Sequence, residues 1–157
     1  MKIKTTLLKI VTLIIDAFVA FFAFTLTMDL ISSIRDHSIF GLQISTIISL
    51  YLAVLVILGI SFCFFKIFRL IDTHKFFTTT ALKLVKTIRY LFITGTVVLM
   101  GILPFVYYTA DQADAPGIII IALGIIFIPL VIAAFISVME KILINSIQFK
   151  QENELTI

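Results

Sequence analysis

Four long apolar runs constrain this chain more than any other feature. They cover residues 10–31, 42–65, 90–110 and 116–139, and the last three contain no charged side chain. About 20 apolar residues in a helix cross the hydrocarbon core of a bilayer. Lipid offers no partner to backbone N–H and C=O groups, and runs of this length without alternation satisfy them as helices. The sequence therefore predicts an all-α, polytopic membrane protein with a bundle of four transmembrane helices.

The composition excludes a single water-soluble domain. Hydrophobic residues make up 61% of the 157 residues, charged residues 13%, and the mean hydropathy is +1.22. Soluble domains typically contain about 45–50% apolar residues. The first run follows three lysines, as in a signal peptide, but it is longer than an h-region and lacks a clear small-residue cleavage site. We therefore expect an uncleaved first span.

The positive charges indicate how the chain lies in the membrane. Three of the twelve Lys and Arg precede the first run, six lie in residues 66–89, and two lie in the tail at 140–157. Arg35 alone lies in a connection on the other side of the membrane. Lysine and arginine beside spans favour the cytoplasmic face, so the sequence predicts cytoplasmic N and C termini and a cytoplasmic loop at residues 66–89.

The central loop at residues 66–89 carries the main polar pattern of the chain. Three threonines precede a stretch whose apolar side chains recur on one face and whose bases lie on another, which predicts an amphipathic cytoplasmic helix between the second and third spans. A solvated connector and a docking surface for a cytoplasmic partner both fit this pattern. No recognition helix accompanies the bases, so we expect no direct nucleic-acid binding. The candidate partner-binding residues are Lys66, Arg69, Asp72, Lys83, Lys86, Arg89, Glu152 and Glu154.

Asp16 is the candidate functional acid inside the membrane. It lies within the first run, where an ionised carboxylate costs several kcal/mol unless it is protonated, hydrated or paired. The other runs contain no basic residue, and we expect Ser49, Thr94 and Thr96 as polar neighbours. Both a hydrogen-bonded structural acid and a coupling carboxylate fit.

Catalytic chemistry has no recognisable residue set in this sequence. Cys63 is the single cysteine, and His74 has no other ligand-type side chains at metal-binding spacing. No nucleophile is paired with a base. We therefore expect a non-enzymatic protein without a metal or cofactor.

Three separate motifs carry a resemblance to a known family. They are Leu70-Ile71-Asp72 followed by Phe76 or Phe77 and Ala81-Leu82-Lys83; Asp114-Ala115-Pro116-Gly117; and a tail with Lys141, Asn145, Ile147 and Lys150 to Ile157. With these motifs the chain resembles the bacterial membrane family of unknown function DUF2975 (YoaS-like) over nearly its whole length. The resemblance implies four helices and the bacterial cytoplasmic membrane. Many family members are encoded beside a small helix-turn-helix regulator, which implies such a regulator as a cytoplasmic partner.

Two classes of function fit these observations. In the first, the protein is a membrane-anchored regulatory protein whose cytoplasmic face binds its partner. In the second, it is a small oligomeric transporter that uses Asp16, which predicts a homo-oligomer in the bilayer. Immunity to a secreted peptide is a third alternative that the sequence leaves open.

Overall fold

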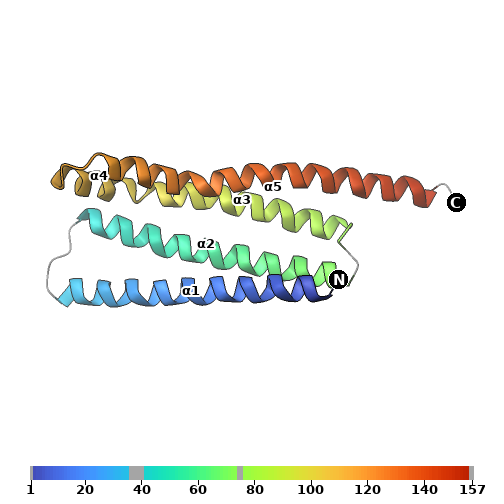
Figure 1. Cartoon of the computed structure of the whole chain (residues 1–157), viewed down its shortest axis with the longest axis horizontal. Helices are drawn as coiled ribbons and strands as arrows, with labels where there is room; N and C mark the ends of the chain where they lie inside the picture. Colours follow the sequence, from blue (N-terminus) through green and yellow to red (C-terminus); the bar gives the residue numbers. More distant parts are fainter. Residues whose placement is uncertain (1, 36–40, 74–75, 156–157) are drawn as a thin grey trace.

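The described residues form five α-helices (Figure 1). The computed structural model describes residues 2–35, 41–73 and 76–155, with side chains from residue 5 to residue 152 of these ranges. Four stretches are long and apolar enough to cross a membrane, and α3 and α4 together form the third. The prediction of an all-helical chain with four such segments is confirmed. The helices are α1 (Lys2–Arg35), α2 (Gly41–Asp72), α3 (Thr79–Met100), α4 (Leu103–Gln112) and α5 (Gly117–Leu155).

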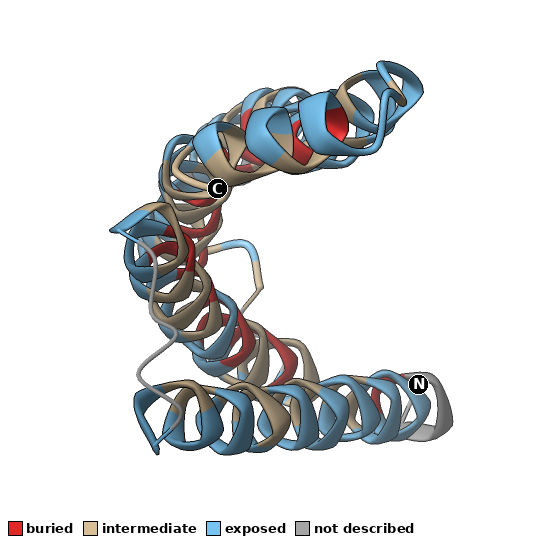
Figure 2. Cartoon of the chain, turned by 90° about the vertical axis from the view of Figure 1, so that its left-hand side faces the viewer, coloured by how far each residue is buried: buried red, intermediate tan, exposed pale blue. Residues whose placement is uncertain are grey.

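The helices of the predicted four-span bundle form an open, curved row. The main contacts in the described part of the chain run from α1 to α2, from α2 to α3 and from α3 to α5, so the first and last helices of the row do not close on each other (Figure 2). Most large apolar side chains are exposed. Lipid tails are as apolar as leucine, so exposed faces create no hydrophobic force that would close the row.

The start of α1 and the end of α5 lie toward the same end of the four long helices. Here α1 begins, α2 ends, α3 begins and α5 ends, and we call this the basic end (Figure 1). A helix of about 20 residues is already long enough to cross the hydrocarbon core of a bilayer. Helix α5 has 39 residues, and its C-terminal part extends beyond the ends of the other helices in Figure 1. The last turns of α5 therefore lie outside any bilayer that the row crosses.

The start of α3 replaces the separate amphipathic helix that we expected between the second and third spans. Between α2 and α3 the described residues form no further helix: α2 continues to Asp72, and α3 starts at Thr79 and runs directly into the third span. Thr78 caps α3, and its hydroxyl accepts a hydrogen bond of 3.5 Å from the N–H of Ala81. The helix continues into the span because residues 79–100 contain no proline.

A break near the middle of the third span separates α3 from α4. Pro104 has no N–H to donate to the carbonyl four residues earlier, so the α-helical ladder is interrupted there. At the break, the N–H of Gly101 donates to the carbonyl of Val98, and the Ser49 hydroxyl of α2 donates to this same carbonyl. A Cβ atom added at Gly101 would lie 3.0 Å from the Ser49 oxygen. Glycine therefore allows α2 to approach the break closely.

Candidate functional site

Three helices converge at the basic end around a small apolar core. Ala81 of α3 is fully buried, and it packs with Leu143 and Ile147 of α5, which are 4% and 9% exposed. Leu70 at the end of α2 and Phe76 of the connection pack against the same core. Burial of this kind holds the three helix ends as one unit. We call this unit the basic-end platform.

The basic-end platform brings together motifs that lie far apart in the sequence. Leu70, Phe76 and Ala81 belong to the first motif of the family resemblance, and Ile147 belongs to its C-terminal motif. The sequence indicated that the C-terminal segment was polar and cytoplasmic, but it did not reveal this packing. The signal was present in the spacing of Leu143 and Ile147, which lie four residues apart and therefore share one helix face.

Exposed bases surround the basic-end platform. Arg69 on α2 and Lys83 and Lys86 on α3 are exposed, and each was predicted as a candidate partner-binding residue. The ammonium of Lys66, which is also exposed, lies 4.4 Å from the centre of the Phe62 ring one turn earlier. Such a contact orients the side chain without removing its charge from the surface. The structure thus places four of the predicted bases on one end of the molecule.

The acidic members of the predicted set have different surroundings. Asp72 forms an ion pair with Lys9, which links the start of α1 to the end of α2. Glu152 lies exposed in the last turns of α5. Glu154 lies in the final turn of the same helix, but its side chain is outside the described residues, as is His74. Asp72 is therefore tied to α1, while Glu152 lies on the part of α5 that extends beyond the row.

Arg89 differs from the other predicted bases because it is largely enclosed. Its side chain is 22% exposed and that of Glu140 is 12% exposed, and the Arg89 Nη1 lies 2.9 Å from the Glu140 Oε2. The same nitrogen donates a hydrogen bond of 3.2 Å to the Ser137 hydroxyl. The Glu140 oxygen accepts no well-aligned hydrogen bond among the described residues, so the contact is an ion pair by proximity. Sequence reasoning missed Glu140, although it directly follows the apolar run.

Asp16 finds its partner on α2. The Ser61 hydroxyl donates a hydrogen bond of 2.6 Å to the Asp16 Oδ2, and Ser61 is 6% exposed. The Asp16 Oδ1 is buried without a hydrogen-bond partner among the described residues. Of the polar neighbours that we expected, Ser49 donates to Val98 and Thr96 to the carbonyl four residues earlier. The sequence did not indicate Ser61, because it does not show which residues of α2 lie beside Asp16 of α1.

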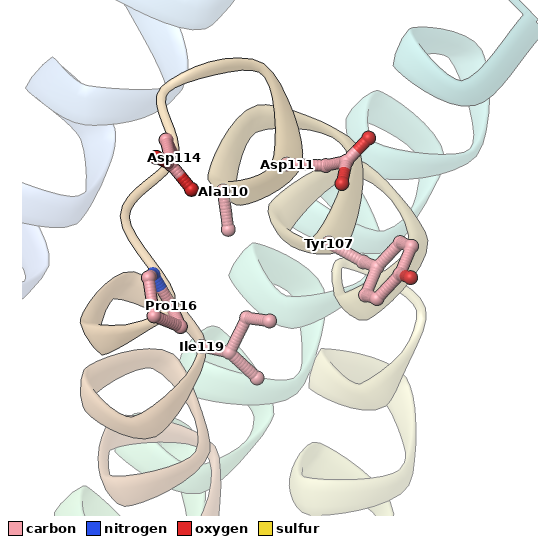
Figure 3. A pocket seen from close by; sticks show the side chains of 6 residues that line it. All are labelled: Tyr107, Ala110, Asp111, Asp114, Pro116 and Ile119. Carbon is pink, nitrogen blue, oxygen red and sulfur yellow. The ribbon is translucent and has the colours of Figure 1, made fainter.

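A small pocket lies at the α4–α5 turn, at the opposite end of the helices from the basic end. It has a volume of about 230 Å³, and Tyr107, Asp111, Asp114 and Pro116 are among its lining residues (Figure 3). Asp114 has a φ of 49°, in the left-handed region. The two carboxylates lie on opposite sides of the turn in Figure 3 and do not converge. Across the described residues, no three His, Cys, Asp or Glu side chains form a group that would hold a metal ion.

The four apolar helices define a multi-pass helical membrane protein. The particular family follows from comparison with known sequences. The family described as "Protein of unknown function (DUF2975)" matches residues 41–157, and the chain belongs to it. The chain is 40% identical over 93 residues to the uncharacterized membrane protein YoaS of Bacillus subtilis (strain 168). That match covers 59% of this chain and 58% of the relative. No solved structure matches the chain.

Proposed function

We propose that this protein is a non-enzymatic membrane anchor whose basic-end platform binds a cytoplasmic helix-turn-helix regulator and holds it at the bacterial cytoplasmic membrane. The observation that carries the proposal is the joint packing of α2, α3 and α5 around Ala81, Leu143 and Ile147. Spanning a bilayer requires only apolar helices, so it does not explain a packed unit at their ends. The proposal also takes the basic end as cytoplasmic, which its excess of Lys and Arg favours.

Charge supports the choice of partner surface. Arg69 and Lys83 are exposed around the basic-end platform, and they would attract an acidic surface of the regulator. Pairing of this kind contributes more to the rate of association and to specificity than to affinity. A regulator could therefore be captured and released without large conformational change. The remaining surface of a helix-turn-helix protein, which binds DNA, would face away from the membrane.

The test is site-directed photocrosslinking in native membranes. A photoreactive amino acid in place of Lys83 should crosslink a DNA-binding regulator. The same photoreactive amino acid in place of Tyr107, at the opposite end of the helices, should not. Neutralising Arg69 and Lys83 with glutamine should lower capture by up to about fivefold per charge, because an exposed pair contributes about 0–1 kcal/mol. The effect should weaken at high salt.

A double variant with the same loss of charge provides the control. Lys86→Gln with Lys141→Gln removes two bases from the same end but leaves Arg69 and Lys83 in place. It should capture the regulator better than the Arg69→Gln, Lys83→Gln variant does. Equal capture by both variants and the parent, or crosslinks at Lys83 to no DNA-binding protein, would contradict the proposal.

A small transporter is the second candidate function, and one observation favours it. The Asp16 Oδ1 is buried without a hydrogen-bond partner among the described residues, so this carboxylate has an acceptor available to a proton or a substrate cation. Asp16→Asn keeps the bond with Ser61 and removes the titratable charge. For a transporter, proton-coupled flux in vesicles should then disappear at unchanged abundance. Unchanged flux would leave Asp16 with a structural role.

A further inference from the structure

A groove between α3 and α5 leads from the basic end into the membrane-spanning part of the protein. Two cavities of about 380 and 430 Å³ lie along it, and Arg89 and Ser137 line both. We call them together the α3–α5 groove. Because the two cavities share these residues, they form one continuous depression on the exposed side of the helix pair. The proposed function makes no use of it.

The chemistry of the α3–α5 groove changes along its length. The cavity further from the basic end is lined by apolar side chains, among them Ile93, Leu130 and Ala134. The other cavity includes Lys141 and Glu140. Tyr90 lies beside Arg89 in the first cavity and is 53% exposed. Aromatic residues of this kind favour the boundary between hydrocarbon and headgroups. Toward the basic end, the lining of the groove thus changes from apolar to aromatic to basic. This order matches the acyl chains, the interface and the headgroup region of one leaflet.

A second base extends the polar end of the α3–α5 groove. Lys86 lies four residues before Tyr90 and seven before Ile93, so helical geometry places it on the same face, nearer to the basic end. Lys86 and Lys141 are both exposed, and neither forms an ion pair within the described part of the chain. Arg89 is already paired with Glu140, so its charge is compensated. The two lysines therefore provide a positive pair at the mouth of an apolar groove.

We propose that the α3–α5 groove binds an anionic phospholipid from the leaflet at the basic end. The headgroup phosphate interacts with Lys86 and Lys141, and one acyl chain lies against Ile93, Leu130 and Ala134. Charge distinguishes this occupant from a second copy of the chain. A symmetric contact through the groove would place two further lysines in the same interface, whereas a phosphodiester neutralises the pair.

The test measures which lipids remain on the purified, full-length protein. Nanodiscs contain equal amounts of phosphatidylglycerol and phosphatidylcholine with identical acyl chains, and native mass spectrometry counts the lipids retained after mild detergent extraction. The parent protein should retain phosphatidylglycerol preferentially. Lys86→Gln with Lys141→Gln should reduce this preference by roughly fivefold for each lysine. Lys66→Gln with Arg69→Gln, which removes the same charge from α2, outside the groove, should leave the preference unchanged.

A third variant tests the apolar part without changing any charge. Ala134→Phe fills the α3–α5 groove and should reduce the retention of both lipids. Soluble glycerol phosphate at millimolar concentration should not displace the bound lipid. An equal loss of preference in the two double variants would show diffuse surface attraction and overturn the proposal. Normal retention by Ala134→Phe, or displacement by glycerol phosphate, would also overturn it, since neither result fits a bound acyl chain.

Discussion

Removal of Glu140 should destabilise the contact between α3 and α5 strongly. The Arg89 side chain is 22% exposed, and Glu140→Ala would leave its guanidinium with the Ser137 hydroxyl as its hydrogen-bond partner on α5. Breaking a buried ion pair by removing one partner typically costs about 3–5 kcal/mol. Because Arg89 keeps some access to solvent or headgroups, we expect the low end of that range, about 3 kcal/mol. This corresponds to about a hundredfold increase in the unfolded fraction.

The single cysteine provides the assay. Cys63 is 7% exposed, and it packs with Ile60, Ile67 and Ile88 between α2 and α3. A maleimide dye reacts with it only when this packing opens, so the labelling rate reports the opened population. We expect Glu140→Ala in mixed micelles to label about a hundredfold faster than the parent. Far-ultraviolet circular dichroism should confirm that the unlabelled variant remains helical.

The double variant separates an ion pair from two independent contributions. Arg89→Leu combined with Glu140→Leu removes both charges, and replacing a buried pair by apolar residues is often neutral. The double variant should therefore label more slowly than Glu140→Ala alone. If Glu140→Ala labels at the rate of the parent, the ion pair does not stabilise this contact. The same conclusion follows if the effects of Arg89→Leu alone and Glu140→Leu alone simply add in the double variant.

Two further predictions concern topology and the break in the third span. Reporter fusions after Ile157, within residues 78–80 and after Asp114 should read cytoplasmic, cytoplasmic and external, and an external reading within residues 78–80 would contradict the orientation. Gly101→Ala should destabilise the protein by about 1–3 kcal/mol, because the new methyl group would lie 3.0 Å from the Ser49 oxygen. The Cys63 labelling assay measures this loss, and Gly124→Ala, which meets no atom within 4 Å, is the matched control.

The helices were predictable because the membrane leaves the backbone few alternatives. Long uncharged runs must satisfy their backbone groups internally, and Pro104 removes one of the N–H groups that would do so. The arrangement of the helices was not predictable in the same way. A closed bundle and an open row expose different amounts of apolar surface, but lipid covers both at little cost. Apolar patterning alone therefore does not fix which helices touch.

The polar contacts show a similar division. Exposure of Lys83 and Lys86 follows from their helix face, opposite the buried Ala81 and Ile88. Arg89 follows on the same helix, yet it turns toward α5 and pairs with Glu140. That pairing depends on the register between α3 and α5, which α4 separates in the chain, and no local pattern encodes it. The same reasoning applies to Asp16 and Ser61.

The position of α1 depends on polar contacts more than on apolar burial. Its main packing in the described structure is against α2, and its apolar side chains are mostly exposed. Polar contacts between described residues of α1 and α2 include the Lys9–Asp72 ion pair, the Ser61–Asp16 hydrogen bond and a hydrogen bond of 2.8 Å between Thr27 and Tyr51.

Apolar contacts could be exchanged for lipid at many registers of α1 against α2, whereas these three contacts are satisfied together at one register. Asp16 then has a structural reason to be in the membrane, because its bond to Ser61 is the contact that lies between the other two. A helix held in this way can also be released by breaking few bonds. Asp16 fixes α1 on α2 and is also the acid that the transport interpretation uses, so the structural and transport interpretations of Asp16 meet in a single contact.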